Sequence, residues 1–194
     1  QYREYASRLM IRRLRDEPMV SKYFPSINIT EKTHTIPWEN AHLAHYITVA
    51  DEFKQWFEVS REEQDKKKLS NLVVLLARIG AVIAASNNPR FPTKNSKAYL
   101  GNNSKVEATL DLIEKETEAG RKSIVFLDSP SQAVHLEELA QERGIKSIIL
   151  SGDVSQEERT TALRDDFRNG DASVCFATFG VARYGLNIPE ASSV

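Results

Sequence analysis

Short apolar runs and amphipathic stretches alternate along the second half of the chain. Three runs rich in Ile, Val, Leu and Phe have the length of β-strands, at Ser123–Asp128, Lys146–Leu150 and Ser173–Thr178. A stretch of helical length precedes or follows each run. This order implies parallel strands joined by helical crossovers. Because the runs are apolar throughout, we expect an α/β fold with helices on both faces of a parallel sheet.

Polar residues mark where these helices begin and end. Capping boxes, in which Ser is followed three residues later by Glu or Gln, stand at Ser104, Ser129 and Ser155. The second helix is predicted over Pro130–Arg143, and Gly144 ends it. The third helix is predicted to carry its apolar side chains on one face, at Ala162, Leu163 and Phe167.

The first half of the chain is mostly helical in pattern. A helix is predicted at Tyr2–Arg15, where apolar residues stand among arginines, and a short strand at Lys32–Ile36. Two longer helices are predicted over Ala41–Val59 and Leu69–Ala85. The expected organisation is therefore an entry helix or linker at 1–22, a first strand with a helical insertion at 23–100, and an α/β core at 101–194.

Two tryptophans fall in or beside the helical insertion. Trp38 precedes its first predicted helix, and Trp56 lies within that helix. We expect both aromatic side chains to pack this helical appendage onto the α/β core.

Composition places the chain among ordinary globular proteins. Of its 194 residues, 41% are hydrophobic and 27% are charged. The formal net charge is −1, but residues 1–100 hold 16 Lys and Arg against 11 Asp and Glu, whereas residues 101–194 hold 10 against 16. A basic face for an acidic partner is therefore compatible with the near-zero total.

Membrane segments and disulfide frameworks are not indicated. No apolar run approaches the roughly 20 residues that a membrane-spanning helix needs. Cys175 is the one cysteine, which excludes an intramolecular disulfide and a zinc cluster built on cysteines. The first residues lack signal-peptide character, and the first is not Met. We expect no membrane contact, a cytoplasmic location (nuclear in a eukaryote), and a chain cut from a longer one.

Motifs for nucleotide hydrolysis and metal binding are missing from the sequence. No G-x-x-x-x-G-K-[ST] phosphate loop is present, and Gly120-Arg121-Lys122-Ser123 precedes a strand instead of following one. His42 and His45 could share a helical face, but no third ligand accompanies them. We therefore expect two ordinary helix histidines, no metal site, and no catalytic residue within this chain.

Polar residues stand where the three predicted strands end, at Asp128-Ser129, Ser151-Gly152 and Thr178. Ligands of parallel α/β sheets bind at the carboxyl ends of the strands. Gly180 and Arg183 follow Thr178, and exposed backbone N–H groups beside a positive charge suit a phosphate. A plain strand-to-helix turn accounts for the same residues equally well, so the residues alone leave both interpretations open.

Three blocks of the second half have the order and spacing of a known set of motifs. SIVFLDSPSQ at Ser123–Gln132 is similar to a motif in which a strand ends beside nucleic acid. GIKSIILSGDVSQEERTTALRDDFRNG at Gly144–Gly170 is similar to a glycine turn, an S-x-E-E-R helix and an F-N/R-N ending. ATFGVARYGLNIPEASSV at Ala177–Val194 is similar to S-T-x-A-G-G-x-G-L-N-L-x-x-A. Together the blocks resemble the second RecA-like lobe of superfamily-two helicases, in the Swi/Snf-type branch of double-stranded DNA translocases.

Two blocks of the first half agree with this resemblance. LMIRRLRDEP at Leu9–Pro18 is similar to the family's entry into the lobe, and NLVVLLARIGAVIAASNNP at Asn71–Pro89 to its L-x-x-L-R-x-x-C-N-H-P helix. The chain departs from the family in having six residues between Thr178 and Gly185, where five are usual. The family's first lobe and its last motif are missing, which implies an incomplete lobe that is inactive alone.

The resemblance implies a RecA-like parallel sheet preceded by a helical appendage, within an ATP-dependent DNA helicase or translocase. ATP and Mg²⁺ would be bound mainly by a first RecA-like lobe of the same polypeptide, over which this lobe closes. Double-stranded DNA would be the partner of the second lobe. Carried over by motif, the nucleic-acid contacts fall on Ser129, Thr178, Gly180 and Arg183, and the nucleotide cleft on Gly185 and Asn187.

Two other functions stay open. The chain could be a non-catalytic docking module that binds a protein partner through its helical appendage. It could also be an RNA helicase lobe of the same superfamily. The Leu9–Pro18 and Asn71–Pro89 blocks favour the DNA branch, because RNA helicase lobes usually lack such a helical insertion.

Overall fold

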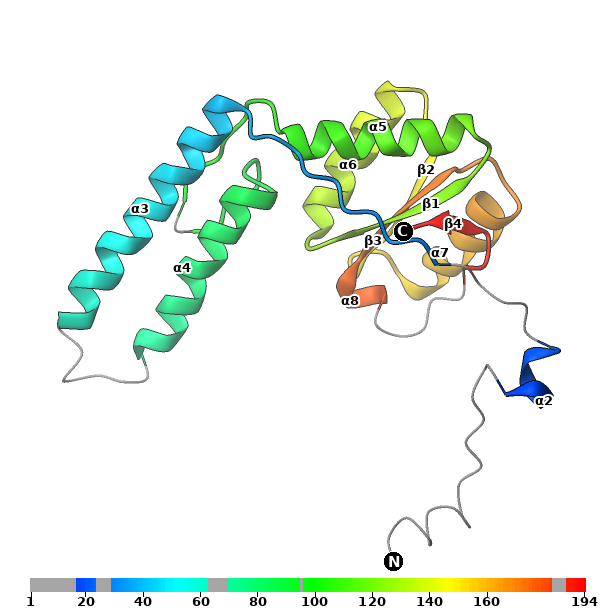
Figure 1. Cartoon of the computed structure of the whole chain (residues 1–194), viewed down its shortest axis with the longest axis horizontal. Helices are drawn as coiled ribbons and strands as arrows, with labels where there is room; N and C mark the ends of the chain where they lie inside the picture. Colours follow the sequence, from blue (N-terminus) through cyan, green and yellow to red (C-terminus); the bar gives the residue numbers. More distant parts are fainter. Residues whose placement is uncertain (1–16, 24–28, 63–69, 95, 183–187) are drawn as a thin grey trace, which may run out of the picture. The chain divides into compact units, whose positions relative to one another are not determined.

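The computed structural model describes residues 17–23, 29–62, 70–94, 96–182 and 188–194 (Figure 1). The chain divides into two units, residues 1–35 and residues 36–194. In the first unit, helix α2 covers Pro18–Ser21 and starts with proline, whose missing N–H is tolerated at that position. The helix predicted at Tyr2–Arg15 lies outside the described residues.

The strand predicted at Lys32–Ile36 is wrong. These residues form no regular element, and their side chains are exposed except for half-buried Ile36. A strand needs a hydrogen-bonded neighbour, and no described strand pairs with this segment.

A four-stranded parallel sheet forms the centre of residues 101–194, as the alternation of strands and helices predicts. Its strands are β1 (Lys122–Leu127), β2 (Ser147–Leu150), β3 (Val174–Thr178) and β4 (Ala191–Ser193). Their order in the sheet is β2-β3-β1-β4, and all pairs are parallel. The α/β fold with a helical region before it is therefore confirmed.

Helices cover both faces of the sheet. On one face lie α5 (Ser104–Glu118) and α6 (Pro130–Glu142), which share a buried core with Val174 and Phe176 of β3. On the other lies the π-helix η1 (Ala162–Arg168), which continues α7 (Gln156–Thr161) and shares a core with Cys175 and Ala177. Successive residues of β3 thus alternate between two cores. Burial raises the pKa of the Cys175 thiol to about 12, which keeps it protonated and inert.

The helix starts follow local hydrogen bonding. Ser155 and Glu158 form the predicted reciprocal capping box, and the Ser129 hydroxyl accepts from the backbone N–H of Gln132. Helix α5 differs, because Asn103 rather than Ser104 is its cap and accepts from the N–H of Lys105 at 3.0 Å. Asparagine is at least as good a cap as serine, so the helix begins one residue earlier than predicted.

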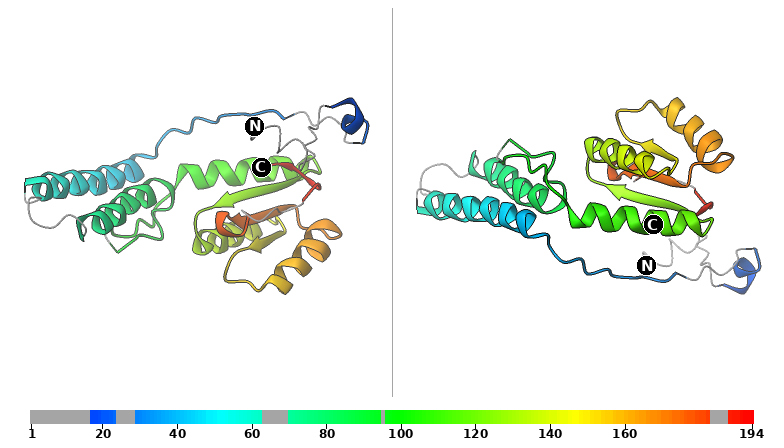
Figure 2. Two further views of the ribbon diagram at one scale, coloured as in Figure 1. Left: turned by 90° about the horizontal axis from the view of Figure 1, so that it is seen from below. Right: turned by 90° about the horizontal axis from the view of Figure 1, so that it is seen from above.

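The helical insertion forms an antiparallel hairpin of α3 (Asn40–Glu62) and α4 (Ser70–Asn87), side by side in Figures 1 and 2. Both helices run slightly past the predicted ends. Val49 of α3 packs against Ala81 and Ala85 of α4 in a small buried core. No helix among the described residues is both long and apolar enough to cross a membrane.

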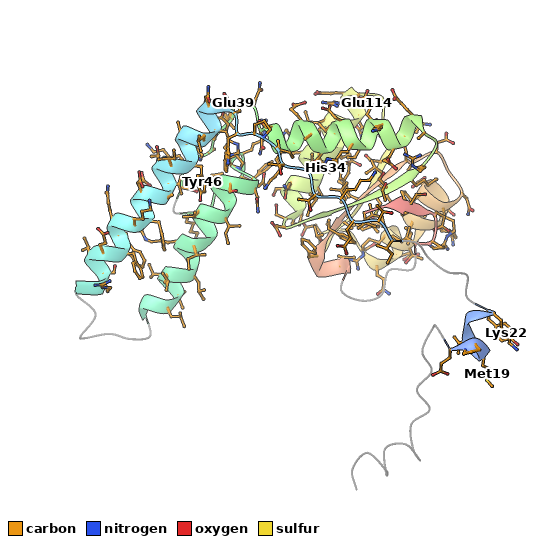
Figure 3. The ribbon with its side chains drawn as sticks, viewed as in Figure 1. Met19, Lys22, His34, Glu39, Tyr46 and Glu114 are labelled. Carbon is orange, nitrogen blue, oxygen red and sulfur yellow. The ribbon has the colours of Figure 1, made fainter. Side chains whose placement is uncertain are left out.

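Hydrogen bonds close the base of the hairpin, where Glu39 lies at the start of α3 (Figure 3). The Nε2 atom of buried His42 lies 2.8 Å from the backbone oxygen of Ala85. The Glu39 carboxylate accepts from the backbone N–H of His42 at 2.8 Å and from the hydroxyl of Tyr99 at 2.9 Å. A hydrogen bond from the backbone of Ala41, together with these two bonds, lowers the pKa of Glu39.

The two tryptophans belong to the hairpin itself, contrary to the prediction. The Trp38 ring lies 4.9 Å from the ring of His42 and 5.1 Å from that of Tyr46. Trp56 lies under the guanidinium of Arg78, with the Arg78 Cζ atom 4.7 Å from the ring centroid. Both contacts stabilise the hairpin rather than its junction with the α/β core.

Candidate nucleic-acid interface

The carboxyl ends of three strands meet at one edge of the sheet. Leu127 of β1 pairs with Thr178 of β3, and Leu150 of β2 pairs with Ala177. The residues that follow, including Ser129 and Ser151, therefore lie along the same edge. Thr178 and Ser151 are buried polar residues, with 6% and 2% of their surface exposed. The sequence correctly predicted that these strand ends gather, which is where ligands of parallel sheets bind.

Ser129 connects the end of β1 to helix α6. Its hydroxyl oxygen accepts from the backbone N–H of Gln132 at 3.3 Å and lies 3.5 Å from the side-chain nitrogen of Asn88. The cap turns Ser129 toward the amino end of a 13-residue helix, where unpaired N–H groups favour an anion. The exposed Asp128 carboxylate stands next to it and opposes an anion there.

The chain leaves β3 through a single helical turn, α8 (Phe179–Ala182), which agrees with the strand-to-helix turn that the sequence left open. A Cβ atom added to Gly180 would meet nothing within 4 Å, and the residue is exposed. The backbone beside Thr178 is thus open to a ligand. Arg183, Gly185 and Asn187 lie outside the described residues, so their predicted roles stay predictions.

Arg159 also belongs to this edge, although the sequence motifs do not single it out. The side chain leaves α7 half-buried, and its Nη1 atom donates to the backbone oxygen of Ser151 at 3.0 Å. The sequence feature that could have identified Arg159 is the capping box at Ser155, because it places Arg159 one turn into the helix. The contact fixes a guanidinium beside the carboxyl ends of β2 and β3.

Lys105 supplies a second positively charged side chain, beside the end of β1. A cavity of about 230 Å³ opens between the starts of α5 and α6, lined in part by Lys105, Thr109, Asp128 and Gln132. The Lys105 ammonium donates to the side-chain oxygen of Asn87 at 2.7 Å. This contact joins the end of the hairpin to the strand-end region.

A larger cavity of about 650 Å³ lies at the opposite, amino edge of the sheet. Lys146 on its wall is paired with Asp171 at 2.9 Å. None of the candidate binding residues named from the sequence lines this cavity. The carboxyl edge is the better candidate despite its smaller cavity, because crossover loops and helix starts converge on that end of a parallel sheet.

The described part of the chain gathers no cluster of metal ligands. No group of three or more His, Cys, Asp or Glu side chains in it could hold a metal ion. His42 is engaged with the backbone of Ala85, and burial lowers the pKa of His45, so each acts within the hairpin.

Comparison with known proteins defines the class. Residues 104–194 match the family described as the helicase conserved C-terminal domain. The sheet, its two helical layers and the polar edge all lie within this segment. This segment is therefore similar to the C-terminal domain of helicases, which supports the broader part of the expectation.

Two of the proteins to which the chain is similar are RNA helicases. The chain is similar to the ATP-dependent RNA helicase DBP3 of Yarrowia lipolytica, with 34% identity over 85 residues, covering 44% of this chain and 16% of that protein. It is also similar to the DEAD-box ATP-dependent RNA helicase RhpA of Helicobacter pylori (strain 26695), with 32% identity over 112 residues, covering 58% of this chain and 22% of that protein. The chain thus spans about a fifth of the length of these relatives.

Proposed function

We propose that the chain is the C-terminal motor lobe of an ATP-dependent RNA helicase and holds the phosphate backbone along the carboxyl edge of its sheet. The observation that carries the proposal is the gathering of Ser129, Arg159 and Thr178 at one edge of the helicase domain. The names of the relatives support RNA as the nucleic acid.

Each residue of the edge has a simple part in backbone binding. The hydroxyls of Ser129 and Thr178 donate to phosphate oxygens, and the Arg159 guanidinium, one N–H of which already holds Ser151, supplies positive charge. The backbone at Gly180 is open to the nucleic acid, because no other atoms crowd this position. Such contacts position a nucleic acid without identifying its sequence, and binding should therefore weaken as salt rises.

A Swi/Snf-type translocase of double-stranded DNA is the second candidate. The specific observation in its favour is the α3–α4 hairpin, which ends at Asn87. Asn87 accepts a hydrogen bond from Lys105 of α5, and the next residue, Asn88, lies against Ser129 of the edge. The segment Asn71–Pro89 also carries the sequence resemblance to that branch. The two candidates share the phosphate-binding edge and differ in the nucleic acid.

ATP hydrolysis belongs to the proposal for the whole protein. In it, ATP and Mg²⁺ are held mainly by a first RecA-like lobe, as the resemblance to superfamily-two helicases implies. That lobe is then the protein partner of this one. A cytoplasmic or nuclear location belongs to the same proposal.

Fluorescence anisotropy with labelled single-stranded RNA and with duplex DNA tests the proposal. The chain should bind RNA more tightly than DNA, with log K falling by about 0.7 per phosphate contact as log salt rises. Thr178→Val keeps the shape of the side chain and removes its hydroxyl, and should weaken binding about two- to tenfold. Ser173→Ala, before the start of the same strand, is the matched control and should bind normally.

Three results would contradict the proposal or part of it. Absence of binding to either nucleic acid at low salt would contradict the interface. Unchanged binding by a folded Thr178→Val variant would remove Thr178 from it. A preference for duplex DNA would favour the translocase candidate.

A further inference from the structure

Helix α4 has two apolar stripes, and α3 covers one of them. Ala81 and Ala85 are buried against α3. On a side that α3 leaves free, Leu72, Leu76, Ile79 and Ile83 are 54%, 59%, 37% and 52% exposed. Four aliphatic side chains in one exposed line mark an interaction surface.

The spacing of this exposed stripe indicates a helix as its occupant. The four residues follow one another at intervals of four, three and four positions, as do core residues of a coiled coil. This order of intervals is the same in both directions. An antiparallel copy of the stripe therefore fits it: Leu72 faces Ile83 of the other copy, and Leu76 faces Ile79.

Charge also favours a second copy over an unlike partner. Arg78 is the one charged residue of α4, and its guanidinium lies over Trp56, toward α3. The exposed stripe thus offers no charge that would select an oppositely charged partner or fix its register. Beside the stripe, a Cβ atom added to Gly80 would meet nothing within 4 Å, which leaves room for a close helix.

The area is sufficient for a weak dimer. The stripe and the neighbouring Val73, which is 71% exposed, present on the order of 500 Å² of apolar surface per copy, so two copies would cover about 1,000 Å². That value lies at the lower limit for a specific interface. A symmetric contact of one surface with itself is also the commonest form of homodimer.

We propose that two copies of the chain associate through their α4 helices, antiparallel about a two-fold axis, so that the two α4 helices lie between the two α3 helices. The site lies outside the helicase domain, and the proposal does not depend on the proposed function.

Sedimentation equilibrium of the 194-residue chain at concentrations up to about 100 μM measures the association. The mass should rise from 21.9 kDa toward twice that value. Leu76→Glu keeps a good helix former at an exposed position and should weaken dimerisation at least roughly tenfold. Leu112→Glu is the matched control, because Leu112 is an equally apolar residue, 41% exposed, on α5. Circular dichroism confirms that each variant is folded.

Cysteine cross-linking tests the orientation. Cys175 is buried, so an introduced cysteine is the reactive thiol. The Leu72→Cys/Ile83→Cys double variant should form a disulfide-linked dimer on oxidation, whereas each single variant should remain uncrosslinked. A monomer at all concentrations, a dimer that Leu76→Glu leaves intact, or efficient cross-linking of Leu72→Cys alone, which indicates a parallel pair, would overturn the proposal.

Discussion

Ser129 combines a structural role with the proposed binding role. Its hydroxyl caps α6 by accepting from Gln132, and it also lies at the strand-end edge. The two roles can be separated because Asp caps a helix as well as Ser does, but its negative charge repels a phosphate.

Ser129→Ala should lower the free energy of unfolding by about 1 kcal/mol, since it removes the cap. Ser129→Asp should keep the free energy of unfolding near that of the wild type and weaken nucleic-acid binding more than Ser129→Ala does. Urea unfolding measures the first quantity and anisotropy the second. Wild-type affinity in the Asp variant would limit Ser129 to capping.

Residues differ in how far the sequence predicts them. The Ser129 and Ser155 caps were predicted, because a cap depends only on neighbours three positions away. Arg159 was missed, because its partner is the backbone of Ser151, on a strand that only the folded chain brings near. The contact of Trp56 with Arg78 likewise depends on how α4 folds back against α3.

At the scale of elements, the amphipathic pattern predicts helices better than it predicts their hydrogen bonding. Leu163 and Phe167 are four residues apart, which suits an α-helix, yet they lie in the π-helix η1. The end of η1 is held from another element: the Lys122 ammonium donates to the backbone oxygens of Phe167 and Gly170. The strand predicted at Lys32–Ile36 does not form, because no described strand pairs with this segment.

Replacement of Lys122 by Met tests this support of η1. The variant keeps the apolar stem of the side chain and removes two charge-assisted hydrogen bonds, so the free energy of unfolding should fall by about 1–3 kcal/mol. Lys115→Met, at an exposed position of α5, is the matched control and should change it by less than about 0.5 kcal/mol. Urea unfolding measures both. Equal stability of the two variants would show that Lys122 does not support η1.

For the whole molecule, the sequence predicts a parallel sheet covered by helices, but it does not predict which strands lie next to each other. Alternating helices and strands indicate a parallel sheet, whereas the placement of β3 between β1 and β2 is fixed by long-range pairing. That placement brings Thr178 beside the end of β1 and gives the edge its composition. The choice between RNA and DNA depends on contacts with a ligand, for which the apolar and polar pattern carries no signal.

The most direct test of the central claim is a titration of the isotope-labelled chain, of 21.9 kDa, with single-stranded RNA, followed by amide NMR shifts. The account predicts the largest shifts along the carboxyl edge, at Ser129, Gly152 and Gly180, and little change at Gly144 and Gly170 by the amino-edge cavity. Shifts concentrated at Gly144 and Gly170, or no shifts at low salt, would contradict a nucleic-acid interface at the carboxyl edge.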